Sequence, residues 1–390
     1  MHVGFICNEY PAVSSGGGIG IFTQTLARYL INNGFKVTIF GVYKNHRTNK
    51  ISYDGQIKII SLTYKYIPKI HFELNRWLLM RRIEKEHKIN NLDILESPDY
   101  QGWLRKSKID IPIVTRIHNP EKFGFMEQSI NVDKAFLKMI DSEQNSIKNS
   151  DYIISCSKSV VEASKKTYSK IDFSKKPIKT IYNFIDTDFF KPTNEKHNSA
   201  DILVVFAGRI SEKKGLFELI NAWPSVIKNI KNAKLIIAGR DSFIKGKSMI
   251  QMLKKSLPNN IKDSVTFKGF IDSSGILNLF QKADICVLPS HREVFSIVAL
   301  EAMAVGVPVV YTKIEPAYEL IKDNENGLLC NVNDSTDISE KILLLCGNKD
   351  LRFKIGNNAR KTVLDNFSIT KLGKKNIEFY KNCIEKFPSP

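Results

Sequence analysis

The sequence has few cysteines, no long hydrophobic run and a shortage of acidic residues, and each absence excludes certain kinds of protein. Because no 18 uncharged apolar residues follow one another, no segment is predicted to span a bilayer. The apolar stretch near the N-terminus is about five residues long and leads into polar residues and a proline, which does not fit a signal peptide. The six cysteines are scattered, without the spacing of a zinc site or redox motif, so we interpret them as buried thiols in a reducing cytoplasm.

The 40 acidic residues are outnumbered by 58 basic ones, which gives a formal net charge of +18. Such a surplus indicates an anionic partner: a phosphate-bearing small molecule, a nucleic acid or an acidic membrane. Nucleic acid is the least favoured of the three, because the sequence contains no stacking-aromatic motif, zinc finger or recognisable helix-turn-helix. The chain of 390 residues is longer than one hydrophobic core usually accommodates, so two domains are expected.

Short β-branched runs alternate with amphipathic stretches along the chain, a pattern typical of parallel sheets covered by helices. A polar run after Pro192 is typical of a linker, which predicts domains at 1–195 and 196–370 and a closing helix at 371–390 that completes the first domain. Each half contains the strands of one doubly wound domain. The predicted strands are 2–7, 36–40, 93–97, 111–117, 151–157 and 178–183, then 201–208, 233–239, 264–269, 284–290, 307–312 and 326–330.

A glycine-rich loop at 14–20 follows the first predicted strand and precedes a helical pattern. Glycines let a backbone approach a phosphate, and a helix N-terminus offers free N–H groups, although a flexible turn would have the same composition. A dinucleotide-binding turn is excluded because seven residues separate strand and loop, and no acid ends the second strand. The stretch 239–248 is not a P-loop, since six residues instead of four separate its glycines.

Two glutamates, Glu293 and Glu301, are separated by seven residues just after the predicted strand 284–290. In an open α/β sheet, ligands bind in the crevice beyond the carboxyl ends of the strands. Carboxylates there can accept hydrogen bonds from sugar hydroxyls. Glu301 lies in an otherwise apolar run, where an unpaired carboxylate would be costly, which favours a functional role.

Arg209 and Lys214 follow another predicted strand, at 201–208, and precede a helix start. A guanidinium binds a diphosphate bidentately and a lysine adds a point charge, so the pair suits a departing nucleoside diphosphate. A lysine in such a loop is also common in proteins without this function.

Together these segments resemble the family 4 glycosyltransferases, which have the GT-B fold and retain the anomeric configuration. The resemblance extends over nearly the whole chain, and its most specific block is the E-x7-E pair with the Ala-Met-Ala-x-Gly-x-Pro-Val tail that follows. It implies an α/β protein with two Rossmann-like doubly wound domains that face each other across a deep cleft. The matching catalytic positions are His118, Arg209, Lys214 and Glu293, and the donor-binding positions are Gly16, Gly17, Gly18, Gly208, Arg209, Lys214, Phe295, Ser296, Ile297 and Glu301.

By this resemblance, Glu301 would hold the nucleotide ribose, Glu293 the hydroxyls of the donor sugar, and His118 the transferred sugar. The donor would be a nucleotide-sugar, with UDP-sugar favoured over GDP-mannose. The acceptor would be a glycan or lipid-linked glycan in bacterial surface polysaccharide or glycoconjugate synthesis. No residue stands out as a covalent nucleophile, which agrees with front-face substitution. His118 could instead be an ordinary core histidine.

Two departures from the family pattern affect the donor loop and the linker. Val294, Phe295 and Ser296 stand where Gly-Phe-Gly is common, which bears on the choice of sugar, and Phe184 replaces a glycine. Asp186 and Asp188 form a D-x-D, a motif by which the other major transferase fold binds a divalent cation. This D-x-D lies in the interdomain segment, and the two cations above suit the diphosphate, so we expect no metal or other cofactor.

The segment 44–88 contains eleven basic and four acidic residues together with aromatic side chains, and so supplies +7 of the net charge. Such a surface suits an anionic lipid headgroup, which predicts a cytoplasmic protein that associates peripherally with the inner face of the membrane. An ordinary domain helix with a solvated basic face would have the same composition. Two other functions remain open: a non-catalytic nucleotide-sugar-binding protein, and a nucleotide-sugar epimerase of the same architecture.

Overall fold

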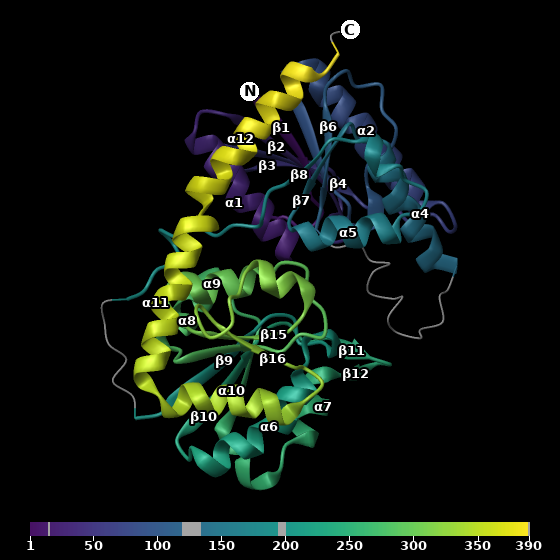
Figure 1. Cartoon of the computed structure of the whole chain (residues 1–390). Coiled ribbons are helices and arrows are strands. Elements are labelled where there is room, and N and C mark those ends of the chain that lie inside the picture. The colour runs from purple at the N-terminus through teal and green to yellow at the C-terminus, as the bar shows by residue number, and fades with distance from the viewer. Residues whose placement is uncertain (15, 119–133, 194–199, 389–390) are drawn as a thin grey trace. The chain divides into compact units, whose positions relative to one another are not determined.

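The computed structural model describes residues 1–14, 16–118, 134–193 and 200–388. It separates into a first unit of Met1–Asn183 with Ile369–Pro390 and a second unit of Phe184–Ser368 (Figure 1). The second unit thus begins before the predicted cut near 195. The reason is that the N–H of Ile185 donates to the carbonyl of Phe367, and Ile185 also bridges Ser368, so the linker is anchored to the second unit from its start.

The first unit is built on an eight-stranded sheet in the order β3-β4-β2-β1-β5-β6-β7-β8. All neighbouring strands are parallel except β3 and β4, which form an antiparallel hairpin at the edge. The strand order reverses between β1 and β5, so the first unit has its switch point there. The strands are β1 His2–Ile6, β2 Lys36–Tyr43, β3 Lys50–Asp54, β4 Ile57–Thr63, β5 Ile94–Pro98, β6 Ile113–Ile117, β7 Tyr152–Ser155 and β8 Ile178–Thr180.

Helices cover this sheet on both faces. α12 lies alongside α1 on one face, and α2 buries Leu79, Met80 and Ile83 in the apolar core of the other face (Figure 1). The basic segment 44–88 therefore contains the β3–β4 hairpin and a helix with an apolar buried face. The helices are α1 Gly18–Asn32, α2 His71–Asn90, α4 Lys134–Lys148, α5 Lys158–Thr167 and α12 Ile369–Lys386, with short 3₁₀ turns η1 Tyr100–Gly102 and η2 Phe173–Lys175.

The second unit has a six-stranded, fully parallel sheet in the order β13-β10-β9-β14-β15-β16. Its order reverses between β9 and β14, which places the ligand-binding crevice of this fold class at the ends of those two strands. The strands are β9 Ile202–Ala207, β10 Ala233–Ala238, β13 Val265–Gly269, β14 Ile285–Leu288, β15 Val309–Thr312 and β16 Leu328–Cys330, and a small separate hairpin consists of β11 Phe243–Ile244 and β12 Lys247–Ser248.

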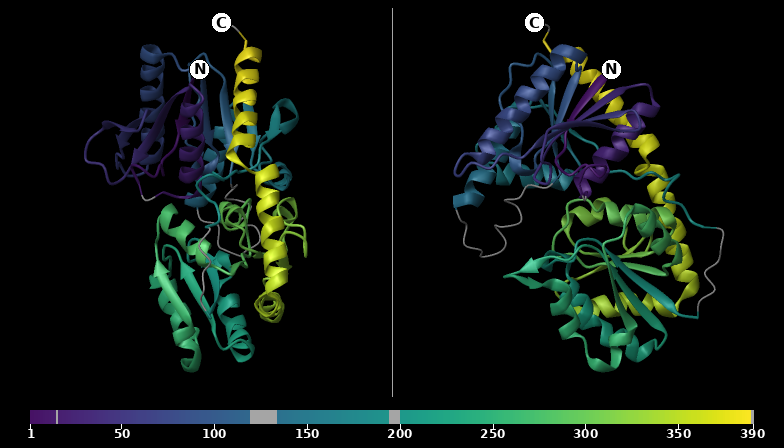
Figure 2. Two further views of the ribbon diagram at one scale, coloured as in Figure 1. Left: turned by 90° about the vertical axis from the view of Figure 1, so that its left-hand side faces the viewer. Right: turned by 180° about the vertical axis from the view of Figure 1, so that it is seen from behind.

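Helices also lie on both faces of the second sheet: α9 contacts α8 and α11 on one side, and α6 contacts α7 and α10 on the other (Figure 1; Figure 2 gives two further views). α9 begins at a serine cap and ends at Gly306, whose φ of 87° turns the chain back toward β15. The helices are α6 Leu216–Asn229, α7 Met249–Ser256, α8 Ser273–Lys282, α9 Ile297–Val305, α10 Ser335–Gly347 and α11 Lys349–Asn366, with 3₁₀ turns η3 Glu212–Lys214, η4 Asn259–Ser264 and η5 Glu315–Glu319.

All six cysteines are buried thiols. Among the helices of the described ranges, none combines the length and the hydropathy that a transmembrane span requires. Each sheet thus forms its own core, and the α/β organisation predicted from the sequence is the one observed.

Candidate functional site

Lys214 and Glu293 meet at the switch point of the second unit. Lys214 ends the η3 turn after β9, and Glu293 follows β14, the neighbouring strand. The Lys214 Nζ and the Glu293 Oε2 atoms lie 2.5 Å apart, and both side chains are partly exposed. Two residues that the sequence assigned to different parts of the donor are therefore in direct contact.

A close approach of two loops makes this contact possible. Gly215 has a φ of 63°, and a Cβ atom at this position would lie 1.8 Å from the carbonyl oxygen of Pro289. Only glycine combines the left-handed conformation with the space available here. The N–H of His291 also donates to the carbonyl of Lys213 at 3.0 Å, which fixes the two loops together.

Arg209 precedes Lys214 in the loop after β9 and is exposed to solvent. It follows Gly208, whose carbonyl oxygen would lie 1.7 Å from a Cβ atom at Gly239. The absence of a side chain at Gly239 thus lets the ends of β9 and β10 come together, and the guanidinium of Arg209 is left available at the carboxyl edge of the sheet. A bidentate contact to an anionic ligand is chemically possible at this position.

Glu301 is held inside the second unit by α9, where its residue exposure is only 5%. Within the described ranges, its carboxyl group has no hydrogen-bond or ion-pair partner. Burial raises the pKa of Glu301 to about 8, so the carboxyl is mostly protonated at pH 7. A nearly buried carboxyl that no protein group stabilises is costly for folding alone, which is typical of a group that binds a ligand.

The residues between the two glutamates mostly serve the local structure. The ring of Phe295 is buried and lies 5.4 Å from the ring of Phe367. Ser296 caps α9 by accepting the N–H of Ala299 at 3.2 Å, and Ile297 is the first residue of that helix. The side chains of Phe295 and Ser296 are thus already engaged, and their backbone groups are what they can offer to a donor.

The glycine loop of the first unit adjoins a carboxylate. The N–H of Gly20 donates to Oε1 of Glu9 at 3.0 Å, and a Cβ atom at Gly17 would lie 2.4 Å from the other oxygen of Glu9. Gly18, the first residue of α1, borders open space instead, and Gly16 takes the left-handed conformation with a φ of 61°. A ligand at this loop would have to approach Gly18, because Glu9 already occupies the turn beside Gly17.

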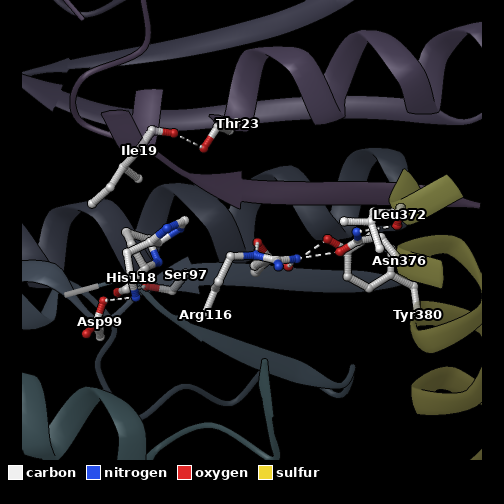
Figure 3. Close-up of polar contacts among 11 residues, drawn as sticks. Ile19, Thr23, Ser97, Asp99, Arg116, His118, Leu372, Asn376 and Tyr380 are labelled. Carbon is white, nitrogen blue, oxygen red and sulfur yellow. Dashed lines mark hydrogen bonds and ion pairs between the residues drawn. The ribbon is translucent and has the colours of Figure 1, made fainter. Parts of the chain in front are cut away.

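His118 lies at the carboxyl end of β6, near the same helix. Its backbone N–H donates to Oδ1 of Asp99 at 2.9 Å (Figure 3). Its half-buried ring meets the ring of Phe22 edge-on, with 5.2 Å between the ring centroids. Loss of hydration and the charge of Arg116 lower the pKa of His118 to about 3, so the imidazole is neutral at physiological pH. A neutral imidazole can donate one hydrogen bond and accept another, which suits a sugar hydroxyl.

The D-x-D segment has a local structural use. Oδ1 of Asp186 accepts the N–H groups of Asp188 and Phe189 at 3.0 and 3.1 Å, and so closes a turn at the entry to the second unit. Throughout the described part of the chain, no three His, Cys, Asp or Glu side chains gather in an arrangement that could hold a metal ion.

The sequence reasoning missed Glu9, Asp99 and Arg116, which surround the glycine loop and His118. Only Arg116 gave a local signal, a charged residue within the apolar predicted strand 111–117. The contacts of Glu9 and Asp99 depend on segments 11 and 19 residues away in the chain.

Two family models match consecutive parts of the chain: "Glycosyltransferase Family 4" over residues 16–189 and "Glycosyl transferases group 1" over residues 188–362. An uncharacterized glycosyltransferase of Methanocaldococcus jannaschii is 28% identical, with 99% of each chain covered.

Two solved structures show the same fold. Sucrose-phosphate synthase of Thermosynechococcus elongatus is similar with a TM-score of 0.81 at 19% identity, over 98% of each chain. HepE of Anabaena, solved with UDP and glucose, has a TM-score of 0.71 at 17% identity and covers 97% of this chain and 99% of its own. The chain belongs to the family 4 glycosyltransferases, and its fold is GT-B with two Rossmann-like domains.

Proposed function

We propose that this glycosyltransferase moves a sugar from a UDP-sugar to a glycan or lipid-linked glycan with retention of configuration and without a metal ion. GDP-mannose is the second candidate donor. The observation that carries the proposal is the Lys214–Glu293 ion pair at the switch point, together with the exposed Arg209 after β9 and the buried Glu301 on α9. The choice of UDP is supported by the related fold of HepE, which was solved with UDP.

Lys214 and Arg209 would stabilise the departing diphosphate. The Lys214 ammonium has three N–H donors, and its short contact to Glu293 occupies one of them, so two remain for phosphate oxygens. Glu293 thereby holds Lys214 in place before the donor arrives. Its second oxygen, Oε1, accepts the N–H of Val294 at 3.4 Å and has a further lone pair for a sugar hydroxyl. Such preorganised charge lowers the barrier because it acts where negative charge develops on the leaving group.

Glu301 would bind the ribose. Each ribose hydroxyl can donate one hydrogen bond, and donation from two hydroxyls favours the ionised carboxylate over the protonated acid. Binding would therefore remove the proton that the buried carboxyl holds in the free protein. His118, neutral and supported by Phe22, would contact the transferred sugar from the first unit.

A panel of nucleotide-sugars tests the donor assignment. A UDP-sugar that is bound raises the melting temperature by mass action, whereas other nucleotide-sugars would not. Donor-dependent release of UDP then separates transfer or hydrolysis from mere binding, and conversion of the donor without UDP release would identify an epimerase. A panel in which only GDP-mannose stabilises the protein would contradict the UDP assignment.

We also propose that the first unit docks on an anionic membrane, in keeping with a lipid-linked acceptor. Lys65, Arg81, Arg82, Lys85 and Lys88 line a groove of about 570 Å³ between β4 and α2. Exposed apolar side chains lie near it: Tyr66 is 73% exposed, Ile70 53% and Trp77 46%. Aromatic residues beside basic ones suit the headgroup region, where each cation contributes roughly 1 kcal/mol.

Not every cation of the segment 44–88 contributes to this surface. Arg76 is buried and bound to Glu73, and Lys58 is paired with the buried Glu86. The docking test therefore uses charge reversal at Arg81, Lys85 and Lys88, with reversal of Lys228, Lys255 and Lys262 in the second unit as the matched control. We expect sedimentation with phosphatidylglycerol vesicles at low salt to be lost only in the first variant. Equal sedimentation of the wild type with anionic and neutral vesicles would contradict the docking.

A further inference from the structure

The first unit contains a buried ion pair whose arginine, Arg116, precedes His118 by two residues. Arg116 of β6 donates from Nε to Oε1 of Glu96 at 2.7 Å and from Nη2 to Oε2 at 3.0 Å, and both side chains are buried. Glu96 lies on the neighbouring strand β5. Taking two charges out of water is costly unless further hydrogen bonds satisfy them, so the partners of this pair matter.

Helix α12 supplies those partners from the other end of the chain. Oδ1 of Asn376 accepts from Nη2 of Arg116 at 2.6 Å, and the hydroxyl of Tyr380 donates to Oε2 of Glu96 at 2.6 Å. Residues four apart lie on one face of a helix, so one face of α12 completes the ion pair. Nη1 of Arg116 has no hydrogen-bond partner within the described ranges, which increases the dependence of this guanidinium on Asn376.

Phe22 of α1 connects the ion pair to His118. The guanidinium carbon Cζ of Arg116 lies 4.7 Å from the centroid of the Phe22 ring. The ring of His118 meets the same ring edge-on, with 5.2 Å between the two centroids. Arg116 and His118 are two residues apart along β6 and its end, so they point to the same side of the sheet (Figure 3). The contacts thus run from α12 through Arg116 and Phe22 to the imidazole.

We propose that Arg116 is a positioning residue for His118 and that Asn376 and Tyr380 of α12 hold it in that role. The inference rests on the proposed function, in which His118 contacts the transferred sugar. The charge of Arg116 also helps to keep the imidazole neutral by lowering its pKa. The C-terminal helix α12, with which the chain returns to the first unit at Ile369, then helps to position His118 in addition to its role in the fold.

Variants of α12 test the inference, because neither Asn376 nor Tyr380 is assigned a contact with the donor. Asn376→Leu removes the acceptor, and the milder Tyr380→Phe removes only a hydroxyl. Leu372→Ala is the matched control: Leu372 is a buried residue of α12 whose side chain takes no part in the polar network. The assay is UDP release from UDP-glucose or UDP-N-acetylglucosamine, whichever is turned over, with kcat and KM measured separately.

We expect Asn376→Leu and Tyr380→Phe each to lower kcat at least tenfold. The KM for the donor should stay within twofold of the wild-type value, because the second unit still binds the nucleotide. In a His118→Ala background, the same substitutions should cause less than a twofold further loss, since coupled residues are not additive. Leu372→Ala should lower the melting temperature but keep kcat within twofold. Unchanged kcat in Asn376→Leu and Tyr380→Phe would overturn the inference. The same fold-loss of kcat in the wild-type and His118→Ala backgrounds would also overturn it.

Two results separate this inference from the proposed function. If His118→Ala itself retains the wild-type kcat, the role of His118 in the proposed function is wrong, and the positioning role is refuted with it. If His118→Ala is impaired and the α12 variants are not, only the positioning role is refuted. A crystal structure of the Asn376→Leu variant gives an answer without any turnover: we expect displaced Phe22 and His118 rings, and unchanged positions of both would overturn the inference.

Discussion

The buried carboxyl of Glu301 predicts a stability that falls as the pH rises. In the unfolded chain this carboxyl has its ordinary pKa of 4.5, whereas burial raises the native pKa to about 8. Between these two values the native state keeps a proton that the unfolded state has lost, so the free energy of unfolding decreases with pH in this window and levels off above it. Since one pKa unit is worth about 1.4 kcal/mol, the total loss approaches about 5 kcal/mol.

The substitution Glu301→Gln isolates this effect, because glutamine keeps the shape of the neutral carboxyl and does not titrate. We expect the variant and the wild type to melt together at pH 5, and the variant to be more stable at pH 9. For a unit of the size of 184–368, the difference is on the order of 10 °C. Thermal unfolding without ligand from pH 5 to 9 measures it.

An exposed glutamate of the same unit provides the control. Glu340→Gln on α10 should follow the wild-type curve, because a solvent-exposed carboxyl loses little hydration on folding. Parallel curves for the wild type and Glu301→Gln over the whole range would refute the reasoning. They would mean that Glu301 has a partner or water that stabilises its ionised form.

Two further predictions concern the same unit. Gly215→Ala should lower the free energy of unfolding by more than about 3 kcal/mol, because the new Cβ would meet Pro289. The control Gly246→Ala, at a φ of 77° with open space around it, should lower it by only about 1 kcal/mol. Equal urea midpoints for the two variants would contradict the close approach of Gly215 to Pro289. UDP-glucose binding at pH 7 should release nearly one proton from Glu301, measured by calorimetry in buffers of different ionisation enthalpy, and Glu301→Gln should abolish the release.

Much of the fold could be predicted because parallel strands that are buried on both faces have nearly continuous apolar sequences. All twelve predicted strands correspond to strands of the two sheets. The β3–β4 hairpin was missed because β3 is largely exposed, although Asp54-Gly55 at its turn was an available signal. The boundary near 195 was placed too late because Ile185 is anchored by Phe367 and Ser368, which local composition cannot reveal.

The sequence allowed us to predict which residues belong to the candidate site, but not which of them contact one another. The spacing of Glu293 and Glu301 identified both glutamates, but their environments differ: one is paired with Lys214 and the other is buried. The pairing depends on the approach of Gly215 to Pro289, 74 positions further along the chain. The network of Arg116 is more remote still, because Asn376 lies 260 residues away.

The central claim is that Lys214 helps to stabilise a departing nucleoside diphosphate, and UDP release by Lys214→Ala tests it most directly. Loss of a preorganised charge at the leaving group should lower kcat about 100- to 1,000-fold, with the apo protein still folded by circular dichroism. Lys213→Ala, one residue earlier, is the matched control and should retain most of the activity. Wild-type kcat in Lys214→Ala with any turned-over UDP-sugar would contradict the account.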